Sequence, residues 1–311
     1  MQKPKIAFID DEPRILRSLK MHFRQSHDVF ITTDASELMK YVSEHDVQVV
    51  ISDQRMPDKQ GTEVLRDIKA ASPNTIRILL TGYADLNAVM DSVNEGEIYR
   101  YITKPWQNDE LKQIVNKATG IAQQTQEITQ NTMQGNDTQK FSGGTGSNRN
   151  ILVLDDDESV YQQIKSHFKS AYTVSWASNL EQAAKLLQKK RFGVTITDST
   201  LNKENITPIV YALKKIQPDL MVLMLTEFKD AHMVIDLINK GQVYRCLPRP
   251  TNFSIMSISL DRAFDHHERL VQQPILAARH HVEEVTESEA LNFSERLKGF
   301  FAKFRGWRII R

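Results

Sequence analysis

The chain carries one set of polar residues twice, at a constant spacing. The first copy consists of Asp10, Asp11, Asp53, Thr81 and Lys104, with a proline directly after the lysine. The second copy lies 145 positions later (10 to 155, 53 to 198, 81 to 226, 104 to 249) and consists of Asp155, Asp156, Asp198, Thr226 and Arg249. An ungapped repeat of this length predicts two domains with one fold.

Length and composition agree with two domains and give no sign of a membrane span. A chain of 311 residues has room for about two domains of ~100–150 residues each. The 40 basic residues nearly balance the 39 acidic ones, so the overall charge does not indicate nucleic-acid binding. A single cysteine suits a reducing compartment. No signal peptide is evident and no apolar run approaches ~20 residues, so we expect a cytoplasmic protein.

Short apolar runs alternate with segments of helical periodicity, which is typical of a parallel α/β sheet. In the first domain, strands are expected at 5–10, 29–32, 47–53, 76–81 and 99–102. Helices are expected at 14–23, 36–44, 62–71 and 86–94, and a fifth begins near 108. Five strands alternating with five helices predict a doubly wound sheet. The first domain is expected to span 1–121, and the second repeats the pattern over 150–270.

The repeated residues of the first domain fall at or just past the predicted carboxyl ends of strands, where such sheets bind ligands. Oxygen-only ligands in a small site favour Mg²⁺, which also bridges to phosphoryl groups. With the metal offsetting its charge, Asp53 can act as a nucleophile toward phosphorus. Lys104 would neutralise the incoming phosphoryl oxygens, and the Thr81 hydroxyl would donate a hydrogen bond to one of them. These residues therefore predict phosphoryl transfer, which needs mainly positioning and charge neutralisation.

Residues 8–12, 51–57 and 104–105 closely resemble the receiver domain of bacterial two-component response regulators, and the second domain resembles it more weakly. This resemblance implies two flavodoxin-like (βα)5 domains with parallel five-stranded sheets. It also implies that Asp53 accepts a phosphoryl group from a histidine kinase or phosphotransfer protein. Segments 80–85 and 94–101 are similar to receivers often fused to HD-GYP phosphodiesterases.

The resemblance further assigns individual roles in the first domain. Asp10, Asp11, Asp53 and the backbone carbonyl of Arg55 would bind Mg²⁺. Tyr101 matches the aromatic residue that changes rotamer when the threonine is drawn toward the phosphoryl group.

The second copy of the site departs from the first. Arg249 replaces the lysine, and the two cations are not interchangeable, because a guanidinium is planar and forked. Glu227 follows Thr226, Asn202 and Ile206 replace the loop proline and glycine, and Cys246 replaces the tyrosine. We interpret this domain as degenerate, with Arg249 paired to Asp198 or Glu227 in one fixed conformation. The alternative is a poor but active receiver in which Mg²⁺ and Asp198 still react.

The remaining segments predict a linker, a spacer and a tail. Residues 122–149 are rich in Gln, Thr, Asn, Ser and Gly and predict a flexible linker. The alternative for its first part is an extension of the fifth helix, since Ile121 and Ile128 keep an apolar heptad spacing. Residues 271–290 are interpreted as an acidic spacer.

Residues 291–311 predict a basic amphipathic helix. Its apolar face consists of Phe293, Leu297, Phe300, Phe301, Phe304 and Trp307. Three interpretations remain open. The tail binds the anionic inner face of the membrane, which would place the protein there peripherally, or it enters a partner's groove, or it docks on one of its own domains.

The sequence therefore predicts a response regulator in a phosphorelay. Mg²⁺-dependent phosphorylation of Asp53 would switch a surface that a downstream protein or a second copy of the chain reads, with no separate effector domain. A phosphate sink or relay intermediate is the alternative. A cyclic-dinucleotide phosphodiesterase is disfavoured, because about 40 residues after the second domain are too few for its catalytic domain. Direct DNA binding is not expected, since no helix-turn-helix pattern follows either domain.

Overall fold

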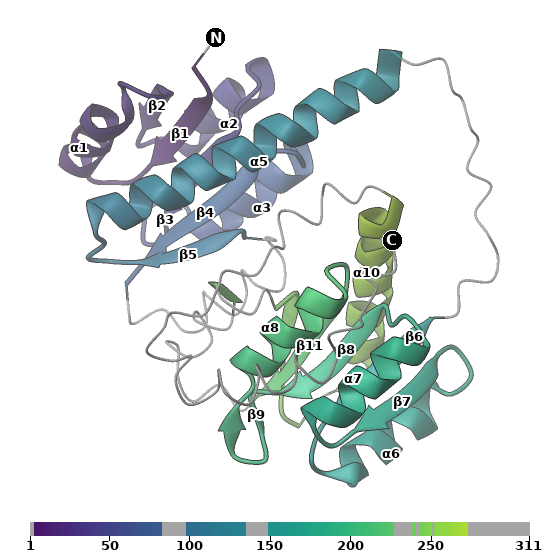
Figure 1. Cartoon of the computed structure of the whole chain (residues 1–311). Helices are drawn as coiled ribbons and strands as arrows, with labels where there is room; N and C mark the ends of the chain where they lie inside the picture. Colours follow the sequence, from purple (N-terminus) through teal and green to yellow (C-terminus); the bar gives the residue numbers. More distant parts are fainter. Residues whose placement is uncertain are drawn as a thin grey trace. The chain divides into compact units, whose positions relative to one another are not determined.

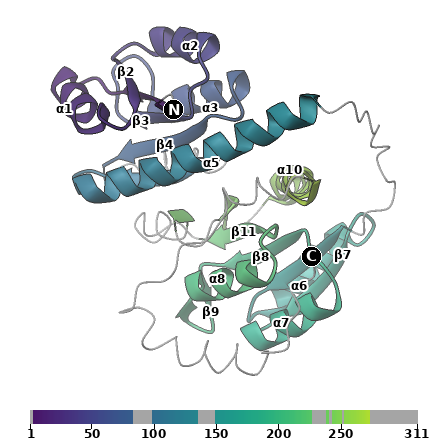
Figure 2. The same ribbon diagram turned by 45° about the horizontal axis from the view of Figure 1, so that its top comes forward.

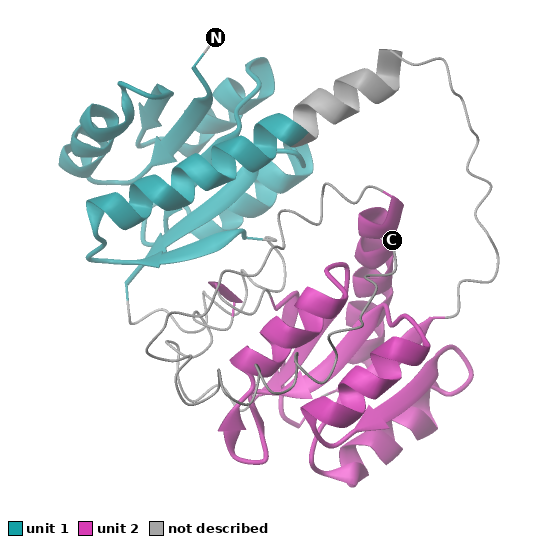
Figure 3. Cartoon of the chain, viewed as in Figure 1, with its two compact units in different colours: residues 1–140, 230–235 teal, residues 141–229, 236–311 magenta. Residues whose placement is uncertain are grey.

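The computed structural model describes residues 3–82, 98–134, 149–226, 238–239, 243–250 and 252–272, without the side chains of 125–134. The chain divides into two compact units, coloured separately in Figure 3. The first unit comprises residues 1–140 with 230–235, and the second comprises 141–229 with 236–311.

The first unit is built on a five-stranded parallel sheet (Figure 1). Its strands are β1 (Lys5–Ile9), β2 (Asp28–Thr32), β3 (Val49–Asp53), β4 (Ile76–Thr81) and β5 (Arg100–Thr103). Their order is β2-β1-β3-β4-β5, which is the flavodoxin-like order of a doubly wound sheet. The predicted fold class is confirmed.

Helices cover both faces of this sheet. They are α1 (Pro13–Phe23), α2 (Ala35–Glu44), α3 (Gly61–Ala71) and α5 (Asn108–Gln134). Leu16 and Phe23 of α1 and Leu111 and Val115 of α5 pack in one core with strand residues such as Ile51. Helices α2 and α3 lie on the opposite face (Figure 1). Burial on both faces explains why the inner strands are continuous apolar runs rather than alternating ones. The helix expected at 86–94 lies outside the described residues.

Helix α5 extends past residue 121, where the first domain was predicted to end. It continues to Gln134, so the segment expected as linker at 122–149 begins as helix. This is the extension that the spacing of Ile121 and Ile128 left open, and Ile121 is buried in the core of the first unit. Residues 135–148 lie outside the described part of the chain.

The second unit repeats this architecture (Figures 1 and 2). Its parallel sheet has the order β12-β11-β8-β6-β7. The strands are β6 (Asn150–Leu154), β7 (Thr173–Ala177), β8 (Val194–Asp198), β11 (Met221–Thr226) and β12 (Arg245–Pro248). The helices are α6 (Glu158–Phe168), α7 (Leu180–Lys189), α8 (Thr207–Ile216) and α10 (Phe253–Gln272). Helix α10 thus ends just beyond the predicted domain boundary at 270.

A short hairpin in the second unit was not predicted. Strands β9 (Thr200–Leu201) and β10 (Glu204–Asn205) pair antiparallel directly after β8. Asn202 and Lys203 connect them with φ angles of 53° and 66°. Positive φ at both central residues is the property of a type I′ turn. The hairpin therefore changes the loop that follows Asp198.

The described helices include none that is both long and apolar enough to cross a membrane. The predicted tail at 291–311, and the spacer before it apart from the end of α10, lie outside the described residues. The three interpretations of the tail therefore remain predictions.

Candidate functional site

The fold of the first unit brings its repeated polar residues to one edge of the sheet. Asp10 follows β1, Asp53 ends β3, Thr81 ends β4 and Lys104 follows β5. These four strands are neighbours in the sheet, and all are parallel. Their carboxyl ends therefore meet, as the sequence predicted.

The amine of Lys104 bridges two buried carboxylates. Its Nζ lies 2.5 Å from Asp53 Oδ1 and 3.1 Å from Asp10 Oδ2. The other oxygen of each carboxylate accepts a backbone hydrogen bond. The Glu12 N–H donates to Asp10 Oδ1 at 2.9 Å, and the Arg55 N–H donates to Asp53 Oδ2 at 3.0 Å. Asp10 and Asp53 are only 1% and 4% exposed, so these contacts replace lost hydration.

Burial and the lysine act on this site in opposite directions. Burial raises the pKa of Asp53, and the charge of Asp10 adds to the rise, while the hydrogen bond and charge of Lys104 oppose it. Burial alone would lower the pKa of Lys104, but the two carboxylates outweigh it and the net shift is upward. The lysine is therefore held as a cation beside the carboxylate that is expected to react.

The donor atoms fit a magnesium ion that keeps part of its water shell. Asp11 is exposed and lies beside Asp10 in the chain, so carboxylate oxygens line the edge of the site. No three His, Cys, Asp or Glu side chains form a ready metal cage in the described part of the chain. Mg²⁺ does not require one, since proteins usually hold it through one or two carboxylates, waters and substrate phosphates. Asp10, Asp11, Asp53 and the Arg55 carbonyl remain its predicted ligands.

The two predicted switch residues of the first unit are buried. Thr81 is 0% exposed and Tyr101, in β5, is 2% exposed. The Thr81 hydroxyl donates to the Gly82 carbonyl oxygen at 3.2 Å. Their roles stay predictions.

Gly61 packs directly against the backbone of Asp53. A Cβ at this position would lie 1.9 Å from the Asp53 carbonyl oxygen, which no side chain can tolerate without movement. The Gly61 N–H donates to the Gln54 carbonyl oxygen at 3.1 Å and closes the loop after β3. Comparison of the two copies of the sequence showed only that Ile206 replaces this loop glycine; the contact with Asp53 is visible only in the structure.

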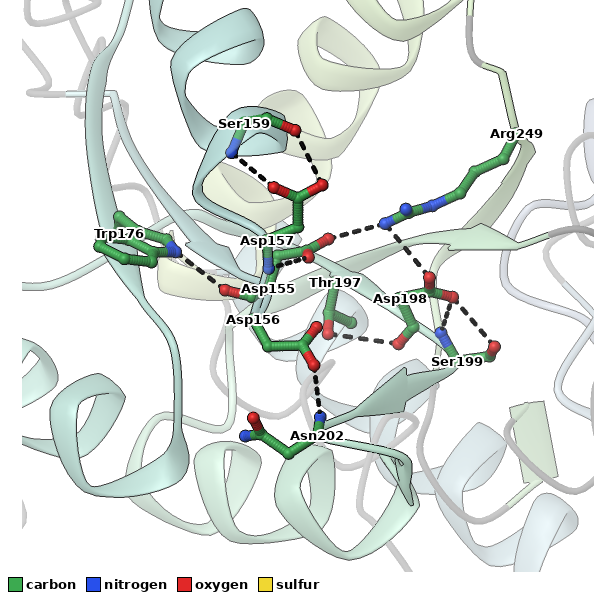
Figure 4. Close-up of polar contacts among 10 residues, drawn as sticks. All are labelled: Asp155, Asp156, Asp157, Ser159, Trp176, Thr197, Asp198, Ser199, Asn202 and Arg249. Carbon is green, nitrogen blue, oxygen red and sulfur yellow. Dashed lines mark hydrogen bonds and ion pairs between the residues drawn. The ribbon is translucent and has the colours of Figure 1, made fainter.

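In the second unit, Arg249 occupies the place of the bridging lysine (Figure 4). Its Nη2 lies 2.7 Å from Asp155 Oδ2 and 3.2 Å from Asp198 Oδ2. The structure contains the predicted pair with Asp198, and it adds a shorter contact with Asp155 that was not predicted. Glu227, the other predicted partner, lies outside the described residues. Both Lys104-Pro105 and Arg249-Pro250 are cis peptide bonds.

The loop after β8 also contacts the acidic residues of the second site. Asp198 Oδ1 accepts from the N–H and hydroxyl of Ser199, at 2.5 and 3.0 Å. Asp156 Oδ2 accepts from the Asn202 N–H at 3.0 Å (Figure 4). Asp156 and its counterpart Asp11 are both exposed, but only Asp156 accepts a hydrogen bond from the described part of its loop.

Two residues replaced between the copies are buried in the second unit. Ile206 stands in the position of Gly61 and is 0% exposed. Its N–H keeps the equivalent hydrogen bond, to the Ser199 carbonyl oxygen at 3.1 Å. Cys246 stands in the position of Tyr101, and burial raises the pKa of its thiol to about 12. The thiol is therefore unreactive near neutral pH.

Comparison with known proteins identifies the family. The response regulator receiver domain model matches residues 6–116 and again residues 151–256. The chain belongs to the response regulator receiver family. We call the two units the first and the second receiver.

Similar proteins include transcriptional regulators. The hydrogenase transcriptional regulatory protein HoxA of Bradyrhizobium diazoefficiens is 32% identical over 116 residues, covering 37% of this chain and 24% of that protein. The aerobic respiration control protein ArcA of Escherichia coli K12 is 26% identical over 197 residues, covering 61% of this chain and 79% of that protein. The chain thus spans about a quarter of the length of HoxA.

Solved structures that resemble this chain include receiver domains. The signal receiver domain of an HD domain-containing protein from Pseudomonas fluorescens Pf-5 is 32% identical. The alignment covers 41% of this chain and 94% of the Pseudomonas chain, with a TM-score of 0.39.

The family match confirms the prediction of two receivers in tandem. The chain is a response regulator with tandem receivers, a type of protein that works in phosphorelay signalling. Receivers generally use Mg²⁺ for phosphorylation and interact with histidine kinases or phosphotransfer proteins. The match spans both receivers, so it does not by itself distinguish a reactive site from a degenerate one.

Proposed function

We propose that the first receiver is a phosphorylation switch in which Asp53 is the phosphoryl acceptor. The observation that carries this proposal is the 2.5 Å contact between Lys104 Nζ and the buried Asp53 carboxylate, with Asp10 on the other side of the lysine. A buried nucleophile beside a mobile cation suits phosphoryl transfer, because the cation can follow the developing charge.

The reaction replaces one bond to phosphorus with another. An Asp53 carboxylate oxygen attacks the phosphorus of a phosphohistidine, the P–N bond breaks, and its electron pair returns to the imidazole. The product is an acyl phosphate on Asp53. Lys104 then exchanges its carboxylate contact for the new phosphoryl oxygens. A bound Mg²⁺, held by Asp10, Asp11, Asp53 and the Arg55 carbonyl, would neutralise charge on the attacking and incoming oxygens.

Thr81 and Tyr101 would carry the signal from the site to the surface. Among the described residues, the Thr81 hydroxyl makes one hydrogen bond, to the Gly82 carbonyl oxygen at 3.2 Å. A phosphoryl oxygen is a stronger acceptor, because it is charged. Exchange of this bond would draw Thr81 toward Asp53 and free space beside Tyr101, which biases a two-state surface. A downstream protein or a second copy of the chain would read that surface.

Intact-mass analysis after incubation with acetyl phosphate and Mg²⁺ tests the proposal. We expect one phosphoryl adduct on the full chain, retained in Asp198→Asn and absent in Asp53→Asn. An adduct that persists in Asp53→Asn would contradict the assignment of Asp53.

The lifetime of the adduct separates a switch from a phosphate sink. Both use the same chemistry at Asp53, but a switch needs a phosphorylated state that outlasts partner binding. Hydrolysis faster than partner association would favour the sink or relay intermediate.

A further inference from the structure

The acidic sites of the two receivers differ in how their carboxylates are occupied. In both receivers a basic side chain bridges the first and last aspartates of the set, Asp10 and Asp53 through Lys104, and Asp155 and Asp198 through Arg249. The two receivers differ at the remaining aspartate, Asp11 in the first and Asp156 in the second. Asp11 and Asp156 are both exposed, but Asp11 makes no hydrogen bond or ion pair with the described residues.

Asp156 is engaged by the hairpin that only the second receiver has in this loop. Its Oδ2 accepts the Asn202 N–H at 3.0 Å, and the Asn202 side-chain amide donates to the Ser178 carbonyl oxygen at 3.2 Å. The turn is thereby hydrogen-bonded both to Asp156 and to the residue that follows β7. Displacing it would cost two hydrogen bonds, one of them to a charged group.

The hairpin also removes the loop conformation that the first receiver has beside its reactive aspartate. Gly61 touches the Asp53 backbone so closely that a Cβ would lie 1.9 Å from its carbonyl oxygen. Ile206 occupies this position in the second receiver and is fully buried; its N–H keeps the equivalent hydrogen bond, but residues 200–205 before it form the hairpin. Thr200, the counterpart of Arg55, lies in β9 opposite Asn205. The counterpart of the residue whose carbonyl is expected to bind the metal in the first receiver is thus a strand residue in the second.

Arg249 is better suited than Lys104 to remain permanently bound between the two aspartates that it bridges. Its Nη2 contacts Asp155 and Asp198 at once, at 2.7 and 3.2 Å. A guanidinium stays charged at all relevant pH values and is less strongly hydrated than an ammonium, so water competes less for it. A lysine, with its flexible stem and compact charge, exchanges partners more easily.

We propose that the second receiver is closed to Mg²⁺ by its own residues, with Arg249 as the resident cation and the Asn202 main chain holding the third carboxylate. The receiver therefore keeps one charge state whatever the concentrations of divalent ions and phosphodonors. The second receiver then keeps one state, in a chain whose first receiver can switch. This inference does not depend on phosphorylation of the first receiver.

Counting Mn²⁺ ions on the full chain by electron paramagnetic resonance, without any phosphodonor, tests the inference. We expect one bound ion on the wild type and none on Asp10→Asn/Asp11→Asn, which removes the ligands of the first receiver alone. An ion that remains on this double variant and disappears when Asp156→Asn is added would overturn the proposal.

Removal of the arginine tests the resident cation itself. In the Asp10→Asn/Asp11→Asn background, Arg249→Gln leaves Asp155 and Asp198 without their cation, and we expect a Mn²⁺ site to appear. The matched control is Arg262→Gln in the same background, which removes an exposed arginine of α10 and should gain no ion. A folded Arg249→Gln variant that gains no ion would contradict the role of Arg249. If this variant fails to fold, the count on the double variant still decides whether the second receiver is closed.

Discussion

Gly61 shows how a single residue without a side chain separates the two receivers. Its backbone lies against Asp53 in the first receiver, while the second carries the buried Ile206 at the same position. A side chain at the first position would not fit without movement of the Asp53 backbone. Prolines and glycines in such loops are therefore as informative as the charged residues.

Substitution of Gly61 by alanine should damage both stability and reactivity of the first receiver. The added Cβ would lie 1.9 Å from the Asp53 carbonyl oxygen, and overpacking of this kind costs about 1–3 kcal/mol of unfolding free energy. Since ~1 Å of misplacement can slow a reaction about 100-fold, adduct formation from acetyl phosphate should also fall strongly. Urea unfolding and time-resolved intact mass measure the two effects.

Gly120→Ala provides the matched control in the same receiver. A Cβ on Gly120 meets nothing within 4 Å, and the residue lies inside α5. Alanine there should stabilise the receiver by about 0.5–1 kcal/mol and leave adduct formation unchanged. Equal losses in both variants would show that Gly61 has no special contact.

Lys214 is a buried amine whose charge should set a pH dependence in the second receiver. It is 3% exposed, and its Nζ has no hydrogen-bond partner among the described residues. Burial lowers the pKa of Lys214 from 10.5 to about 7, partly opposed by the charge of Asp219. Between these two values the unfolded chain binds a proton that the folded chain does not. Stability should therefore rise with pH across this window, by up to ~1.4 kcal/mol per pH unit.

Lys214→Met should remove this rise and stabilise the second receiver at pH 7. Urea unfolding at pH 7 and pH 9 gives the change in unfolding free energy with pH for wild type and variant. Subtracting one change from the other removes the contribution of the other titrating groups. A variant with the same pH slope as the wild type would show that Lys214 keeps its proton when folded.

At the scale of elements, the hairpin β9–β10 is the main difference between two otherwise matching sheets. Its type I′ turn places Lys203 at a φ of 66°, a conformation that favours glycine. A residue with a Cβ is strained there by roughly 1–2 kcal/mol. The same turn holds Asp156 through the Asn202 N–H, so the strained residue lies next to a contact of the acidic site.

Lys203→Gly should relieve this strain. We expect the second receiver to gain about 1 kcal/mol of unfolding free energy, because Asn-Gly is the preferred pair for this turn. Lys203→Ala is the control: it removes the same charge but keeps the Cβ, and should bring little gain. Equal stabilisation by alanine and glycine would attribute the effect to charge instead of backbone strain.

The sequence predicted most elements because their boundaries depend on local patterns. Strand β4 matches the expected 76–81 in full, and the other four strands of the first receiver begin and end within two residues of their expected positions. The hairpin was missed because residues 200–205 are mostly polar and lack the alternation that marks a strand. Its turn is held by contacts distant in the sequence, since Asn202 donates to Asp156 and to the Ser178 carbonyl oxygen.

At the scale of the whole molecule, each receiver has a hydrophobic core of its own. The first core joins α1 and α5 to its sheet, and the second joins α6 and α10 to its own. Arg149, just before β6, pairs with Asp261 of α10 at 3.3 Å and lies over the Phe264 ring at 5.5 Å from its centroid. These contacts hold the residue before β6 against α10 of the same receiver.

Separate fragments should therefore fold. We expect residues 1–134 and 149–272 to show cooperative thermal unfolding by circular dichroism. Only the first fragment should gain a phosphoryl adduct with acetyl phosphate and Mg²⁺. A fragment that unfolds without cooperativity, although the full chain is folded, would show that the receivers stabilise each other.

The sequence by itself determined the tandem repeat, the parallel sheets and the carboxylates, threonine and basic residue at the strand ends. It could do so because strand periodicity and residue spacing are local properties of the chain. Only the tertiary structure decided which groups meet there: Arg249 reaches Asp155 as well as Asp198, the Asn202 N–H holds Asp156, and Gly61 touches Asp53. Such contacts depend on loop paths and side-chain reach across the sheet edge, which residue spacing does not encode.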